Sequence, residues 1–300
     1  MLKIAWAQQY SHPLPAGHRF PMLKYELIPE QLIYEGSIKE DQLFVPQSLL
    51  ETDALAIHTP AYFSDLLHLG ISPAMVRKIG FPLSKELIER ELIITQGTID
   101  CALFALKYGA AFNVAGGTHH AFSDSGEGFC LLNDIAVASA FLLKNNLAKQ
   151  ILVVDLDVHQ GNGTAAIFEK EKRVFTFSMH GQNNYPLKKQ KSDLDIGLPD
   201  GIVDTDYLNL LSIHLPRLFQ HLEPDFVFYQ SGVDILESDR LGRLGISTLA
   251  CKQRDKFVFT LCKSHKVPVV VVMGGGYSPK IAQIVDAHCN TFRAALDIFF

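Results

Sequence analysis

The stretch ILVVDLDVHQGNG, residues 151–163, decides the fold. It begins with four apolar residues, Ile151 to Val154, and ends in a turn at Gly161–Gly163. An apolar run that closes on glycines predicts a strand buried on both faces, as in a parallel sheet. Open α/β sheets bind ligands at the carboxyl ends of such strands, so the residues after Val154 are candidates for a functional site.

Two carboxylates and an imidazole follow the apolar run at every second position: Asp155, Asp157 and His159. Side chains alternate along a strand, so all three are expected to point the same way. Buried carboxylates are costly unless they are paired or bind metal. The cluster indicates a metal site with Asp157 and His159 as ligands and Asp155 behind them. A salt-bridged strand end is the alternative.

The remaining chain alternates strands and helices. Apolar runs predict strands at 3–7, before Gly116, and at 174–180, 225–234 and 267–277. Helical spacing covers 22–34, 60–69, 83–109, 135–146, 163–170, 205–221 and 248–265, and Gly97 weakens or splits the longest of these. This alternation predicts a three-layer αβα fold with a mostly parallel central sheet of about eight strands.

Composition narrows the class of protein. A formal net charge of -5 argues against nonspecific nucleic-acid binding. Five cysteines without a CxxC pair suggest reduced thiols, and no run approaches the ~18 apolar residues of a membrane span. No linker or repeat interrupts the sequence. We therefore expect one domain over 1–300 in a soluble cytoplasmic protein, without a nucleic-acid or membrane partner.

Asp234, at the end of the apolar run 225–234, offers a third metal ligand. Two carboxylates and one imidazole, with positions left open, suit a catalytic Zn²⁺ or a similar divalent ion. An ion with an open position can lower the pKa of a bound water to about 7.

Further residues supply acid–base chemistry. His119 and His120 form a candidate general-base pair, because histidine titrates near working pH. Tyr277 follows three glycines that allow a close approach, and its hydroxyl can hydrogen-bond an oxyanion. Asp155 and Asn162 would fix the tautomers of the two histidines. The set indicates metal-assisted hydrolysis of a carbonyl compound, most naturally an amide.

Seven segments, in order, resemble the histone deacetylase superfamily, the zinc-dependent deacylases of the arginase-like fold. They are HRFPMLKY (18–25), HTPAYFSDL (58–66), GGTHHA (116–121), GFCLLNDIA (128–136), DLDVHQGNG (155–163), SGVDILESDRLGRL (231–244) and GGGY (274–277). The resemblance covers nearly the whole chain.

The resemblance implies roles for these residues. Asp157, His159 and Asp234 match the ligands of one zinc ion per chain. His120 matches the general base and acid, and His119, paired with Asp155, matches its electrostatic companion. Tyr277 matches the tyrosine that polarises the substrate carbonyl.

Further positions match the family's substrate tunnel and its surroundings. Phe129 and Tyr185, with Gly128, match the tunnel walls, and Leu241 matches its rim. Arg19 matches an arginine of the internal cavity behind the metal. A structural potassium ion is implied near five residues: Asp155, Asp157, His159, Ser178 and Met179.

Two departures matter. Asn162 stands where class I enzymes have aspartate, as in class IV (single-domain) and bacterial members, and it should leave His120 less basic. Tyr185 replaces the commoner phenylalanine. The implied function is hydrolysis of an acylated lysine in a protein or peptide. The alternatives are a hydrolase of acetylpolyamine or another small acylated amine, a long-chain deacylase, an arginase-like dimanganese enzyme, and a non-catalytic acyl-lysine binding module.

Overall fold

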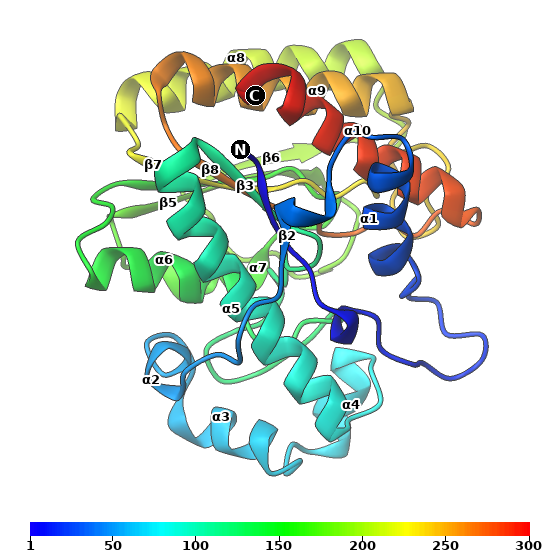
Figure 1. The fold of residues 1–300 in the computed structure, drawn as a ribbon, viewed down its shortest axis with the longest axis vertical. Coiled ribbons are helices and arrows are strands. Elements are labelled where there is room, and N and C mark those ends of the chain that lie inside the picture. The colour runs from blue at the N-terminus through cyan, green and yellow to red at the C-terminus, as the bar shows by residue number, and fades with distance from the viewer.

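Eight parallel strands form one sheet in the computed structural model, which describes residues 1–300 (Figure 1). The strands are β1 Lys3–Ala5, β2 Leu43–Phe44, β3 Ala110–Asn113, β4 Ile151–Asp155, β5 Val174–Gly181, β6 Leu194–Leu198, β7 Phe226–Gln230 and β8 Val269–Val272. Their order is β2-β1-β3-β8-β7-β4-β5-β6. Every pairing is parallel, so the predicted sheet is confirmed and holds no antiparallel strand.

Helices cover both faces of the sheet (Figure 1). They are α1 Lys24–Tyr34, α2 Glu51–Ala54, α3 Pro60–Leu67, α4 Pro73–Ile79, α5 Lys85–Tyr108, α6 Asp134–Lys144, α7 Asn162–Phe168, α8 Asp204–Leu222, α9 Thr248–His265 and α10 Ile281–Phe299. One layer contains α1, α8, α9 and α10, the other contains α5, α6 and α7, and α2 to α4 lie beyond one end. The three-layer architecture is therefore as predicted, and the central strands are buried because both faces are covered.

The longest helix, α5, is continuous through Gly97 and is not split there. Ser84 caps it by accepting a hydrogen bond from the Leu87 amide, and Gly109 ends it with a φ of 90°. A side chain at Gly97 would meet the Tyr10 hydroxyl and the Asn113 amide, so glycine lets this helix pack close to β3. None of the helices is both long and apolar enough to cross a membrane.

The predicted course of the chain after Val154 is corrected. Strand β4 ends at Asp155, and Asp157 and His159 lie in the loop that follows it. Strand alternation therefore does not align the three side chains. The loop is shaped instead by hydrogen bonds from its own amides, Asp157 N to Asp155 Oδ1 at 3.2 Å and Val158 N to Asp234 Oδ1 at 2.9 Å.

Candidate metal centre and its surroundings

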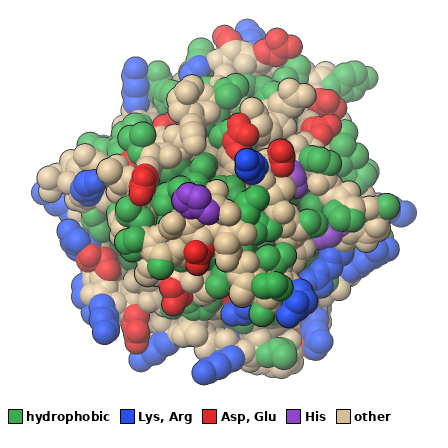
Figure 2. Space-filling view, turned by 90° about the horizontal axis from the view of Figure 1, so that it is seen from below, with side chains coloured by type: hydrophobic (Ala, Val, Ile, Leu, Met, Phe, Trp, Pro, Cys, Tyr) green, Lys and Arg blue, Asp and Glu red, His purple; other side chains and the backbone are tan.

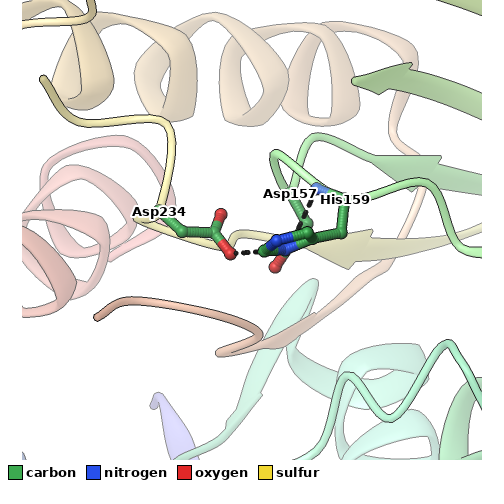
Figure 3. A group of neighbouring side chains, drawn as sticks. All are labelled: Asp157, His159 and Asp234. Carbon is green, nitrogen blue, oxygen red and sulfur yellow. Dashed lines mark hydrogen bonds and ion pairs between the residues drawn. The ribbon is translucent and has the colours of Figure 1, made fainter. Parts of the chain in front are cut away.

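Three buried side chains converge at the carboxyl edge of the sheet. Asp157 and His159 come from the loop after β4, and Asp234 comes from the loop after β7 (Figure 3). One oxygen or nitrogen atom of each lies within 4.8 Å of the others. His159 Nδ1 is 3.1 Å from both Asp157 Oδ1 and Asp234 Oδ2. The predicted group of ligands is therefore assembled.

Glycines and backbone amides hold the two carboxylates in place. The amide of Gly275 donates to Asp157 Oδ2 at 2.8 Å. A Cβ atom on Gly275 would collide with Asp234, and one on Gly232 would collide with Asp157. Because its three glycines have no side chains, the GGGY segment can lie directly against these carboxylates.

The charges of the three side chains suit a cation. Burial lowers the pKa of His159, but hydrogen bonds to Asp157 and Asp234 outweigh burial and raise this pKa to about 10. Burial and the neighbouring Asp157 raise the pKa of Asp234 to about 7. Two buried carboxylates therefore hold a proton on the imidazole between them. A divalent ion fits this donor set and would take the place of that proton.

The two adjacent histidines have different partners. His119 Nδ1 lies 2.7 Å from Asp155 Oδ2, and His120 Nδ1 lies 2.6 Å from Asn162 Oδ1. Burial lowers the pKa of His119, but Asp155 outweighs burial and raises it. Burial lowers the pKa of His120 well below its usual value, and the neighbouring histidines add to this. These effects favour the neutral form of His120, in which one ring nitrogen is an acceptor.

Tyr277 lies beside the metal ligands. Its ring centroid is 6.3 Å from that of His159, and its amide donates to Asp239 Oδ2 at 2.6 Å. Burial and the carboxylates of Asp234 and Asp157 raise the pKa of Tyr277 well above its usual value. The hydroxyl therefore stays protonated and is a hydrogen-bond donor.

A cavity of about 180 Å³ leads from the surface to His120, His159 and Tyr277. The cavity is also lined by all the residues expected in the tunnel: Gly128, Phe129, Tyr185 and Leu241. Gly128 has a φ of 56°, and a Cβ atom there would lie 2.6 Å from the His120 ring. Glycine is therefore required where the wall meets the histidine.

The expected position of Arg19 is corrected by the structure. Arg19 is exposed, lies 5.0 Å from the centre of the Phe129 ring, and lines the outer cavity. The next residue, Phe20, lines the smaller inner cavity, whereas Arg19 lines the outer one. The arginine that lines the inner cavity is Arg90 of α5, whose Nε donates to the Tyr10 carbonyl at 2.8 Å.

The residues expected around a potassium ion are all buried. Asp155 of β4 pairs with Ser178 of β5 in the sheet, and Met179 follows on the same strand. The end of β4 thus lies beside Ser178 and Met179 of β5, and the ion itself stays a prediction.

Two charged residues near this site are not among the predicted ones. Glu127 is buried, accepts a hydrogen bond from Asn162 Nδ2 at 2.6 Å, and forms an ion pair with Lys78. The other is Arg90, and its position in the helical pattern is a signal of burial that the sequence contains. It falls on the apolar side of α5 with Leu87 and Ile94, and a charge at such a position indicates a buried polar role.

Comparisons with known proteins agree with this geometry. The histone deacetylase domain family matches residues 18–292. An uncharacterised protein of Picosynechococcus sp. is 43% identical over 296 residues, which are 99% of each chain. Histone deacetylase 2 of Arabidopsis thaliana is 27% identical over 297 residues, 93% of this chain and 75% of that protein.

Among solved structures, an HDAC homologue in complex with SAHA superimposes with a TM-score of 0.85 at 24% identity, covering 99% of this chain and 84% of that chain. This likeness supports the fold. The family match over residues 18–292, with which the buried group of Asp157, His159 and Asp234 agrees, leads to one conclusion. The chain belongs to the histone deacetylase family.

Proposed function

We propose that this protein hydrolyses the amide bond of acetylated lysine with the help of a bound divalent ion, Zn²⁺ by preference. The observation that carries the proposal is the buried group of Asp157, His159 and Asp234, with His120 and Tyr277 beside it. All of these except Asp157 and Asp234 also line the cavity that opens to the surface.

Each side chain has a chemical task in this proposal. A bound divalent ion would supply a Lewis acid for the carbonyl and would acidify water. His120 takes the proton of the attacking water and later gives it to the leaving lysine amine. Tyr277 donates a hydrogen bond to the carbonyl oxygen as negative charge develops there. Phe129 and Tyr185 exclude water from the lysine side chain.

The inner cavity favours a short acyl group. It has a volume of about 40 Å³ and lies against Phe20, Tyr25 and Arg90. Since one water needs roughly 10–15 Å³ of such space, about three waters or one acetyl group fill it. A long acyl chain would have to displace these side chains.

The mouth of the outer cavity favours a lysine side chain over a polyamine. Arg19 and Lys78 line it, and no carboxylate does. The Arg19 guanidinium lies over the Phe129 ring and forms no ion pair, so its charge would repel the second amine of an acetylpolyamine. An acidic mouth would have favoured the polyamine alternative.

The test compares amine release from acetyl-, butyryl- and myristoyl-lysine peptides and from acetylpolyamines by zinc-replete protein. We expect acetyl-lysine to be hydrolysed fastest and polyamines most slowly. Arg19→Glu should raise the turnover of polyamines relative to that of the peptide. Faster hydrolysis of polyamines by the unmodified protein would favour the small-amide alternative. Binding of acetyl-lysine without any turnover would favour the binding module.

A further inference from the structure

We propose that Glu127 is a positioning residue that holds His120, through Asn162, in the tautomer needed for general-base catalysis. The inference rests on the proposed function for its catalytic meaning. The position of the proton on the His120 imidazole can be measured without any enzymatic turnover.

Four side chains form a continuous polar chain that ends at the surface. His120 Nδ1 contacts Asn162 Oδ1 at 2.6 Å, and Asn162 Nδ2 donates to Glu127 Oε1 at 2.6 Å. The other oxygen of Glu127 is paired with the Lys78 ammonium. Asn162 and Glu127 are 2% and 4% exposed, so water cannot easily replace these contacts.

The direction of the hydrogen bonds along this polar chain follows from the charged pair of Lys78 and Glu127 at its end. An ammonium only donates hydrogen bonds and an ionised carboxylate only accepts them. Glu127, paired with Lys78, therefore selects the NH₂ end of the Asn162 amide. The carbonyl end must then face His120, and an acceptor at that place requires a proton on Nδ1. A neutral imidazole with its proton on Nδ1 leaves Nε2 free as the base.

Asn162 alone could not impose this choice. Its amide carries a donor at one end and an acceptor at the other, and a rotation of 180° exchanges them. With the amide reversed, Asn162 would donate to Nδ1 and move the imidazole proton to Nε2. The carboxylate that fixes the histidine is thus one residue further along the polar chain, at Glu127.

The backbone around Glu127 keeps its carboxylate in place. The next two amides, Gly128 N and Phe129 N, donate to the carbonyls of Lys78 and Ile79 at 3.1 and 2.7 Å. These bonds tie the segment to the end of α4 and so fix the backbone from which the Glu127 side chain reaches Asn162.

The Tyr185 hydroxyl lies near the same carboxylate. Burial raises the pKa of the Tyr185 hydroxyl, and the neighbouring Glu127 carboxylate raises it further. A tyrosine at this wall, in place of phenylalanine, therefore offers its hydroxyl to Glu127.

The test is ¹⁵N NMR of zinc-replete protein with labelled histidine, with the His120 signals identified by their loss in His120→Ala. We expect Nδ1 protonated and Nε2 unprotonated in the unmodified protein. Glu127→Gln should mix the two tautomers and lower kcat/KM about 10- to 100-fold, as for other residues that orient a ligand or base. Glu89→Gln, the same change at an exposed position of α5, should leave the tautomer unchanged.

A charge exchange separates this role from simple support of the loop. Asn162→Asp places two carboxylates in contact and should also lower activity. When Glu127→Gln and Asn162→Asp are combined, the introduced amide can donate to the introduced carboxylate, which accepts from His120. The double variant should therefore exceed both single variants in kcat/KM and restore the Nδ1 proton.

Two results would overturn the inference: a proton on Nε2 of His120 in the unmodified protein, or additive losses in the double variant. If the protein shows the expected tautomer but no turnover, only the proposed function is contradicted.

Discussion

At the scale of single residues, the site requires several glycines, because side chains at these positions would collide with the functional groups. Gly275 and Gly232 leave room for the carboxylates of Asp234 and Asp157, and Gly128 leaves room for the His120 ring. The sequence shows the glycines of GGGY and predicts a close approach. It does not show which carboxylate they approach, because that depends on contacts between segments far apart in the chain.

Gly275→Ala should weaken metal binding strongly, because the added methyl group would collide with Asp234 and move the Gly275 amide away from Asp157. We expect a loss of about 10- to 100-fold in zinc affinity, measured by competition with a chromogenic chelator. Gly70→Ala, where the methyl group makes only ordinary contact with Asp65, is the matched control. Equal zinc affinity in both variants would show that Gly275 has no such role.

Tyr277→Phe should lower kcat/KM for an acetyl-lysine peptide by about 10²–10³, the loss seen when one oxyanion donor is removed. Zinc content should not change, since Tyr277 is not among the three metal-binding side chains. Near-normal turnover by this variant would remove the hydroxyl from the mechanism.

Zinc affinity should rise with pH. Hydrogen bonds to two carboxylates raise the pKa of metal-free His159 to about 10, so zinc must displace a proton at any lower pH. The apparent association constant should therefore increase about tenfold per pH unit between about pH 7 and pH 9, with release of one proton per ion. Titration in weakly buffered solution measures that release directly, and a flat affinity over this range would contradict the shared proton.

At the scale of elements, sequence patterns predict several helices and strands closely, but not the shape of the loop after β4 or the last helix. The apolar runs and caps predict β4, α5 and α9 closely. Strand alternation does not explain the grouping of Asp157 and His159, because β4 ends at Asp155 and amide hydrogen bonds shape the loop. The terminal helix α10 is not among the predicted elements, although Ile284 and His288 recur on its buried side.

Gly97→Ala in α5 should destabilise the protein, although alanine is the better helix former. The gain in helix propensity is about 1 kcal/mol. The new Cβ atom would lie 2.6 Å from the Tyr10 hydroxyl and 3.0 Å from Asn113 Nδ2, and such overpacking costs about 1–3 kcal/mol. Thermal unfolding should show a lower Tm than for Glu89→Ala, an exposed change in the same helix. A higher Tm for Gly97→Ala would mean that the packing around Tyr10 relaxes.

At the scale of the whole molecule, the site is assembled from segments far apart in the chain. Side chains from the loops after β3, β4, β7 and β8 meet at one edge of the sheet, the carboxyl edge at which open parallel sheets bind ligands. The ligands could be predicted because each follows an apolar strand. Glu127 could not be predicted, since a loop carboxylate acquires its role only when the layers pack. The place of Arg90 on the apolar side of α5 indicates a buried residue, but not the cavity that it lines.

The surface around this edge carries mixed charge. Figure 2, which views the molecule from the side of α3 and α4, shows Lys and Arg side chains along the margins and acidic side chains scattered among them. The local charge at the cavity mouth, where Arg19 and Lys78 lie, is therefore more informative about the substrate than the net charge of -5.

The central claim is that the group of Asp157, His159 and Asp234 binds a divalent ion that hydrolysis of acetyl-lysine requires. The most direct measurement is acetate release from an acetyl-lysine peptide by one protein sample as purified, after removal of metal by a chelator, and after stoichiometric Zn²⁺ is restored. We predict turnover that is lost on chelation and recovered with one ion per chain, and no recovery in Asp234→Asn. Undiminished turnover in metal-free protein, or no turnover with one zinc ion bound, would contradict the account.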